Sequence, residues 1–546
     1  MKRKLLFLTA SLISLTMTSC DKGNTSEKQD DEPIKVTLLA SGWINSPTDA
    51  NDTYRKWIKD NYGLDITLMT TNDFESNVII KFASNNKPDI VVFDSMASYN
   101  TIENQGVLIN DWSKYLDTMP EMKKMMHAQR TNENEMSTVE KIFTSDNKLK
   151  VLWTTPDPAT WSLKLREDWV NEFRKDGNDN WMPTTPEDLL NFARWIKANK
   201  PGCYGFTSAG SRASFGTLGN YISYMFGYVN ELPWGLYADE TGNPNFGVLD
   251  GSYEKYLNYI RTIVSEELID PQWYEQDWEH KTKTKEGKIG IEWYPGTISF
   301  ETEQYQADYL PEGETTLNWW KTYNLPSDGG KYSGFMPINS YFGHIITVSK
   351  KCSLDNEKMT RICKFLNDIA FYTEGEGNNK VFKRGVAYDA LRWGVGIEPN
   401  LAFQDIAGTN YKYICTSTKE GEPEHYRNTG AGQGAWDWGA WFSNTGDGVI
   451  QGTAEVVDDI TMKVYEHNII TSAMPTQVQV GSSLNLDSSL VKTVQTMMEN
   501  YSYKYVTGQN TGYDSYQSFV AAWKQRGGDE LLAEAKEQFK ELGYIK

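Results

Sequence analysis

The strongest constraint on the fold is an alternation of strand and helix patterns that begins after about thirty polar and leader residues. Residues 34–39 form a β-rich apolar run, and residues 51–61 place apolar side chains at helical spacing. A strand pattern follows at 64–69, then a helix at 74–85 and a strand at 88–93. Successive parallel strands need a crossover, usually a helix, so this order predicts an α/β fold with helices covering a parallel sheet.

The chain has 546 residues, which is too many for one ordinary hydrophobic core. We therefore expect two or more domains. Residues 150–165 are extended and broken by proline, as expected of a segment that crosses to a second domain. Further helices are predicted over 166–174, 186–199, 253–266, 359–371, 514–525 and 529–542, and further strands over 288–293 and 344–349.

The N-terminus predicts export. Three of the first four residues are basic, and an uncharged, apolar segment follows at 5–17. That segment is too short to span a bilayer comfortably and is typical of a secretory signal peptide. The sequence Met17-Thr18-Ser19-Cys20 is similar to a bacterial lipobox, in which the cysteine is lipidated and the preceding peptide removed. An ordinary signal peptide with a chance cysteine is the alternative. We expect a lipoprotein signal peptide at 1–19 and a lipidated Cys20 on a flexible tether at 20–33.

Several segments, in this order, resemble the bacterial extracellular solute-binding proteins of family 1, the receptors of ABC importers that include maltose-binding protein. The segments are KVTLLASGWINS, FASNNKPDIVVFDS, MPTTPEDLLNFARWIK and GKIGIEWYPGT, followed by a closing helical stretch after residue 505. Each motif is short, and their order carries the resemblance. It covers most of the chain from residue 34 onward.

The resemblance implies a two-domain periplasmic-binding-protein (Venus flytrap) fold, with a helix-covered sheet in each domain and a hinge of several crossings. Domain I would comprise residues 34–150 and 344–400, and domain II residues 151–343 and 401–546. It also implies a receptor without enzymatic activity or required cofactor. A carbohydrate, expected to be an oligosaccharide, would bind between the domains and pass to an ABC importer permease. We expect a monomer in the cell envelope, tied to the membrane only by its lipid and facing the periplasm or the exterior.

Aromatic residues are unusually abundant, with 19 Trp, 31 Tyr and 21 Phe. Sugar rings stack on aromatic faces, and amides and carboxylates bind their hydroxyl groups. Ligands of parallel sheets bind beyond the carboxyl ends of the strands. The candidate ligand-binding residues therefore follow strands or lie in the glycine-rich segment 430–452: Trp43, Asn45, Phe93, Asp94, Ser95, Trp293, Tyr294, Trp436 and Trp438. Core packing is the alternative role for each aromatic residue.

One loop has the spacing of a calcium-binding EF-hand. Asp176, Asn178, Asn180 and Glu187 occupy positions 1, 3, 5 and 12 of such a loop, and all carry oxygen ligands. The sixth position, normally glycine, is Trp181. Some oligosaccharide-binding members of the resembled family carry one Ca²⁺ in a loop that enters a helix. The alternative is a polar loop whose acidic residues complement the dipole of the following helix.

Composition and motifs also bear on other functions. The formal charge of −19 disfavours a nucleic-acid binder, and five His and five Cys are few for a zinc protein. The sequence holds no H-E-x-x-H, G-x-S-x-G or C-x-x-C motif. Two alternatives stay open: an all-helical surface glycan-binding lipoprotein of an outer-membrane uptake system, and a secreted glycoside hydrolase. The pairing of Cys203, Cys352, Cys363 and Cys415 is left open.

Overall fold

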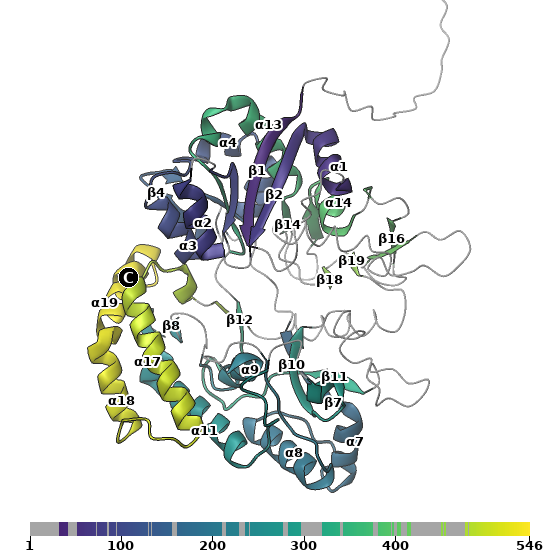
Figure 1. Ribbon diagram of the computed structural model, residues 1–546, viewed down its shortest axis with the longest axis vertical. Helices are drawn as coiled ribbons and strands as arrows, with labels where there is room; N and C mark the ends of the chain where they lie inside the picture. Colours follow the sequence, from purple (N-terminus) through teal and green to yellow (C-terminus); the bar gives the residue numbers. More distant parts are fainter. Residues whose placement is uncertain are drawn as a thin grey trace, which may run out of the picture.

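The structure is a computed structural model, and it places the larger part of the chain in two packed regions (Figure 1). The residues it describes are 32–41, 52–71, 74–84, 87–93, 95–128, 130, 132, 134–154, 161–209, 215–228, 235–239, 241–276, 282–295, 319–338, 342–374, 381–394, 396–397, 401–405, 412–416, 449–450, 453–454, 476–478 and 480–545.

A five-stranded sheet lies at the centre of the first region. Its strand order is β2-β1-β3-β13-β6. β1 is parallel to β2 and to β3, as the strand and helix patterns predict. β13, which comes much later in the chain, is antiparallel to both of its neighbours. The sheet is therefore mixed. The strands are β1 (Ile34–Ser41), β2 (Leu64–Thr71), β3 (Ile90–Phe93), β6 (Leu152–Trp153) and β13 (Ile345–Val348).

Helices and short hairpins cover this sheet. Asp52 caps the N-terminus of the first helix, and Gly63 ends it in the left-handed conformation that glycine adopts without strain. The other elements of this region are α1 (Thr53–Tyr62), α2 (Phe74–Ala83), α3 (Met96–Glu103), α4 (Ser113–Leu116), α5 (Pro120–His127), α6 (Thr138–Phe143), β4 (Thr144–Ser145), β5 (Lys148–Leu149), α13 (Asn356–Asp368), β14 (Phe371–Glu374), β15 (Val381–Arg384) and α14 (Tyr388–Trp393), with a 3₁₀ turn at Cys352–Leu354.

The second region is built around a three-stranded antiparallel sheet of order β10-β7-β11. The helix α8 of this region begins as the sequence predicts, with Thr185 in a capping box and Pro186 at the first position. The elements are β7 (Trp161–Arg166), α7 (Glu167–Lys175), α8 (Pro186–Asn199), α9 (Gly216–Met225), β8 (Leu236–Ala238), β9 (Pro244–Phe246), α10 (Gly247–Asp250), α11 (Ser252–Ser265), α12 (Thr282–Lys285), β10 (Ile291–Pro295), β11 (Trp320–Tyr323) and β12 (Met336–Ile338).

The C-terminal part of the chain packs mainly on the second region. A long helix, α17 (Ser488–Val506), was not predicted from the sequence. It precedes α18 (Tyr516–Trp523), a π-helical turn (Lys524–Gly528) and α19 (Asp529–Leu542). These helices form a column on one flank of the molecule, drawn in yellow-green and yellow, and α19 also contacts α6 of the first region (Figure 1). Short strands complete the described elements: β16 (Leu401–Asp405), β17 (Lys412–Thr416), β18 (Val449–Ile450), β19 (Thr453–Ala454) and β20 (Thr476–Val478).

Buried apolar side chains form two large clusters, one in each region. The first draws on residues between 36 and 153 and between 342 and 391. The second draws on residues between 163 and 336 and between 480 and 539. We call them the first core and the second core. Val151, Leu152 and Trp153 belong to the first core, although the sequence analysis begins domain II at residue 151. Both cores are interrupted in sequence, because the chain passes between them more than once.

Two of these passages lie side by side at the edge of the five-stranded sheet. The Thr154 amide donates to the His344 carbonyl at 3.0 Å, and the Gly343 amide donates to the Thr154 carbonyl at 2.9 Å. The His344 amide donates to Thr154 Oγ1 at 2.9 Å. The chain therefore leaves the first core and returns to it through one hydrogen-bonded pair of segments.

Helix length and composition bear on membrane insertion. In the described part of the chain, none of the helices combines the length and the apolar character needed to cross a bilayer. The expected signal peptide, Cys20 and most of the tether lie outside the described residues.

Candidate functional site

The predicted ligand-binding residues fall into two groups. Phe93, Ser95 and Trp293 lie in the described residues, and Tyr294 belongs to β10. The others lie outside the described residues: Trp43, Asn45, Asp94, Trp436 and Trp438.

Phe93 ends β3 inside the first core. Its side chain has no exposed surface, and its ring makes edge-on contacts with Phe74 at 5.9 Å and with Tyr99 at 5.7 Å between centroids. Two residues later, Ser95 Oγ accepts from the Ser98 amide and caps α3. Phe93 thus anchors the carboxyl end of β3, and Ser95 fixes the start of the next helix.

Trp293 lies near the carboxyl end of β10, on the face that packs against α9. Only 2% of its surface is exposed. Its ring stacks on Tyr221 at 5.7 Å, with 23° between the planes, and meets the edge of Tyr224 at 6.0 Å. This indole is part of the second core, which is the alternative role given for the aromatic residues in the sequence analysis.

Tyr221 and Tyr224 are residues of this aromatic group that the sequence analysis missed. Both lie on α9, three residues apart, so they share one helix face. The Tyr221 hydroxyl is buried without a hydrogen-bond partner, and burial raises the pKa of Tyr221 well above its usual range. The i, i+3 spacing of the two tyrosines was the available signal.

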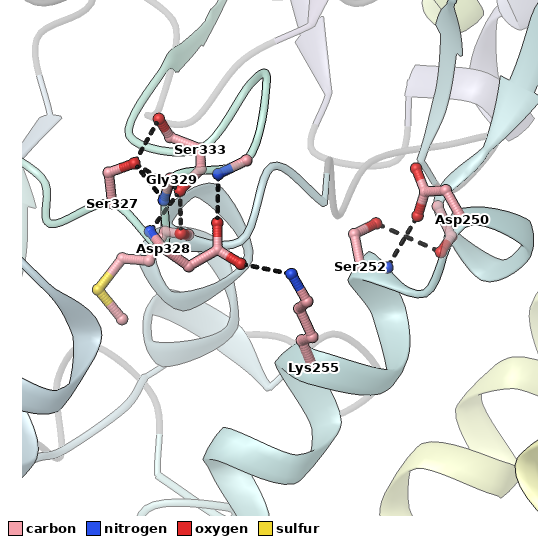
Figure 2. A network of polar contacts seen from close by, with 10 residues as sticks. Asp250, Ser252, Lys255, Ser327, Asp328, Gly329 and Ser333 are labelled. Carbon is pink, nitrogen blue, oxygen red and sulfur yellow. Dashed lines mark hydrogen bonds and ion pairs between the residues drawn. The ribbon is translucent and has the colours of Figure 1, made fainter.

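A polar network fixes the segment between β11 and β12 against α9 and α11 (Figure 2). Lys255, on α11, donates to Asp328 Oδ2 at 2.7 Å, and the Gly330 amide donates to Asp328 Oδ1 at 2.9 Å. Ser333 Oγ donates to the Met225 carbonyl at the end of α9. The network therefore ties the helix that supports Trp293 to the chain that leads back toward Gly343.

Charge and burial act in opposite directions on Asp328. Burial raises the pKa of its carboxyl group, whereas hydrogen bonds from Lys255, the Gly330 amide and Ser333 lower it. The hydrogen bonds outweigh burial, and the pKa of Asp328 lies below its usual value.

The candidate calcium loop lies between α7 and α8. Asp176 Oδ2 accepts from Trp195 Nε1 at 2.9 Å, and Glu187 Oε1 is paired with Arg194 Nη1 at 2.6 Å. The Asn178 side-chain amide donates to the Phe173 carbonyl at 3.1 Å. Within the described residues, no three or more His, Cys, Asp and Glu side chains are grouped to hold a metal ion.

Three of the cysteines are free thiols in the described part of the chain: Cys203, Cys352 and Cys363. Burial raises the pKa of the Cys352 and Cys363 thiols to about 12, so neither is a reactive thiolate near neutral pH.

Comparison with known protein families gives no match. The chain is 23% identical over 339 residues to the fructooligosaccharide ABC transporter substrate-binding protein FusA of Streptococcus pneumoniae. That alignment covers 56% of this chain and 59% of FusA, so it spans less than two thirds of this relative.

Solved structures match the chain over nearly its whole length. A solute-binding protein of Bifidobacterium longum infantis, described as an ABC-transporter-associated binder of HMO, gives a TM-score of 0.62 at 14% identity. The match covers 94% of this chain and 100% of that one. This chain has the solute-binding-protein fold. The prediction of a two-domain fold of sheets and helices is thereby confirmed, as is the similarity to extracellular solute-binding proteins of ABC transporters.

Two further structures share the solute-binding-protein fold. FusA in complex with kestose gives a TM-score of 0.58 at 12% identity, with 94% of this chain and all of that chain covered. The alginate-binding protein AlgQ2 gives 0.57 at 13% identity, with coverage of 93% and 98%. FusA has also been solved as an EF-hand mutant in complex with fructo-nystose, and the AlgQ2 structure is one without calcium ion.

The residues of the loop at 176–187 do not fit a calcium ion as they are arranged here. A calcium loop needs its carboxylates turned toward one point. The two carboxylates instead bind Trp195 and Arg194, which lie on α8. In this arrangement the loop has the contacts of the polar-loop alternative, and the calcium site stays a prediction.

Proposed function

We propose that the protein is an extracytoplasmic receptor that binds an oligosaccharide between its two cores and delivers it to an ABC importer. The observation that carries the proposal is the match of fold, over nearly the whole chain, to a protein described as HMO binding and to FusA in complex with kestose. The two adjacent passages at Thr154 and His344 support it, because paired crossings of this kind let two bodies pivot about a short segment.

We further propose that the protein is a binding protein and not an enzyme, held to a membrane through lipid on Cys20. The division into residues 34–150 with 344–400 and residues 151–343 with 401–546 is proposed with one change. The first boundary moves to residue 154, because Val151–Trp153 pack in the first core. The five-stranded sheet contradicts the all-helical alternative, and the relatives reported above are described as binding proteins.

The buried aromatic residues and the loops that follow them take different parts in this proposal. Phe93 and Trp293 hold the carboxyl ends of β3 and β10 in place. In this proposal, the ligand contacts residues that follow Phe93 and Trp293 or lie in other loops. We propose Trp43, Asn45, Asp94, Ser95, Tyr294, Trp436 and Trp438 for that role, on the chemistry of sugar recognition by aromatic faces and polar edges.

A calorimetric titration tests the proposed function. The purified protein is titrated with fructo-oligosaccharides, milk oligosaccharides, alginate oligosaccharides and N-glycans, and with the matching monosaccharides. We expect saturable one-site binding of at least one oligosaccharide and weaker binding of its monosaccharide. Incubation at the end of the titration should leave the oligosaccharide intact. Hydrolysis of the sugar, or binding of none of the four classes, would contradict the proposal.

A further inference from the structure

The loop at 176–187 has the oxygen-bearing residues of a calcium site, yet two of its carboxylates, those of Asp176 and Glu187, are bonded to side chains of the protein. Asp176 Oδ2 accepts from the Trp195 indole at 2.9 Å. Glu187 Oε1 lies 2.6 Å from Arg194 Nη1, and the same guanidinium makes two further bonds to Glu266 at 2.7 and 2.8 Å. Calcium would have to replace these contacts in order to bind Asp176 and Glu187.

The backbone of the loop also departs from a calcium loop. Such a loop places glycine at its sixth position, where the chain turns sharply. Here the sixth residue is Trp181, and the left-handed backbone occurs at Gly177, with φ of +86°, and at Asn180, with φ of +59°. Arg174 Nε donates to the Trp181 carbonyl at 3.1 Å, which ties the loop to α7.

Aromatic rings connect the loop to both helices. The Trp181 ring lies 5.2 Å from Phe173 and 5.3 Å from Phe192, measured between centroids. The Trp195 ring is parallel to Phe192 within 10°. Ring contacts of this kind add to the free energy of folding beyond the burial of area alone. They join the end of α7 to the middle of α8, which is the connection that a metal ion makes in a calcium loop.

We propose that this loop is a calcium-independent staple, in which the Trp181 and Trp195 indoles, together with the bond from Arg174 to the loop backbone, hold α7 to α8 without a metal. The protein would then keep its second core, and its ligand affinity, in surroundings without calcium. The inference is independent of the proposed function, because it concerns only the junction of α7 and α8.

Thermal unfolding and terbium luminescence test the proposal on the whole protein. The melting temperature should be the same, within error, in excess EDTA and in excess calcium. A calcium ion that bound only the folded state, at a hundredfold excess over its dissociation constant, would raise it by about 5 °C or more. Terbium, which occupies calcium sites and is excited by nearby indoles, should give no saturable emission from the Trp181 loop.

Variants give the proposal a positive test. Trp195→Phe keeps the ring and removes the donor to Asp176, and it should lower the melting temperature by about 2–4 °C equally in EDTA and in calcium. Trp57→Phe is the matched control, because Trp57 contacts Tyr62 through its ring and makes no hydrogen bond through its indole. The control should change the melting temperature less.

The outcomes separate cleanly. A melting temperature that rises with calcium, or terbium emission that saturates and is abolished by Asp176→Ala, would overturn the proposal even if Trp195→Phe failed to fold. Emission that persists unchanged in Asp176→Ala places any ion elsewhere and supports the staple. Failure of the protein to bind any oligosaccharide leaves these readouts unaffected, so the two proposals fail separately.

Discussion

The Asn100 side-chain amide, on α3 of the first core, donates a 3.0 Å hydrogen bond to Oδ1 of Asn485, just ahead of α17 beside the second core. Gln538 on α19 holds the backbone of Asn485. The Asn485 backbone amide donates to Gln538 Oε1, and Gln538 Nε2 donates to the Asn485 carbonyl, both at 2.8 Å. The side-chain hydrogen bond from Asn100 to Asn485 joins the two cores. We expect it to favour the arrangement of the cores seen here.

Removal of this bond should shift the arrangement of the two cores. An exposed neutral hydrogen bond contributes about 0.5–1 kcal/mol, which corresponds to a two- to fivefold change in the ratio of two arrangements. Asn485→Ala and Asn100→Ala should give the same shift, and the double variant should add nothing. Single-molecule energy transfer between dyes at Lys59 on α1 and Lys175 on α7 measures the ratio.

A matched control for that measurement is Asn500→Ala. Asn500 lies on the same helix, α17, but bonds only within it, to the Thr496 carbonyl. It should leave the ratio unchanged. If the parent and Asn485→Ala gave the same distribution of energy-transfer efficiency, the bond would not contribute to the ratio of the two arrangements.

Trp293→Ala should destabilise the second core. Truncation of a buried aromatic side chain costs about 3–5 kcal/mol, because it leaves a cavity against Tyr221 and Tyr224. Trp293→Phe should cost less, since a ring still faces Tyr221. Denaturant unfolding measures both changes. A fully stable Trp293→Ala variant would contradict the packing described here.

Trp43→Ala, by contrast, should weaken oligosaccharide binding by about 1–3 kcal/mol, by analogy with stacking of bases on aromatic side chains, with little change in stability. Calorimetric titration of this variant measures the loss of affinity.

Asp328 should make the protein sensitive to acid. Its pKa is lowered in the folded state, so it adds stability above its unfolded pKa of about 3.9, and that stability is lost as the pH falls through the folded pKa. Asp328→Asn should therefore cost about 1–3 kcal/mol at pH 7, from lost charge-assisted hydrogen bonds, and much less at a pH below both pKa values. Denaturant unfolding at the two pH values measures the difference.

Asp117→Asn is the control for acid sensitivity. Asp117 also pairs with a lysine, Lys123, but its side chain is 86% exposed. Exposed pairs contribute little to stability, so this variant should unfold like the parent at both pH values. If Asp328→Asn lost the same free energy of unfolding at neutral and at acidic pH, side-chain shape rather than charge would explain the contribution of Asp328 to the network in Figure 2.

Much of the fold could be predicted from the sequence, because its signals are local. The β-rich runs gave β1, β2 and β3, and Thr185 with Pro186 gave the start of α8. α17 was missed although Val494, Met497, Met498 and Tyr501 have helical spacing and are buried. Its polar and tyrosine-rich sequence weakens the contrast between the two faces of the helix, and that contrast is the signal that periodicity detects.

The candidate site was harder to predict, because it depends on partners that are distant in sequence. Alternation along β10 identifies two faces but does not say that α9 covers the one carrying Trp293. The calcium loop shows the same limit. Spacing counts the oxygen-bearing residues from 176 to 187, but it cannot show that Trp195 and Arg194 bind two of them from the next helix.

Small-angle X-ray scattering of the purified protein, with and without a saturating oligosaccharide identified by calorimetry, tests the central claim most directly. Two bodies that pivot about the segments at Thr154 and His344 should close around their ligand, and the radius of gyration should fall. A monosaccharide that does not bind should leave the profile unchanged. Saturating binding with an unaltered radius of gyration would contradict a receptor that closes on sugar between its two cores.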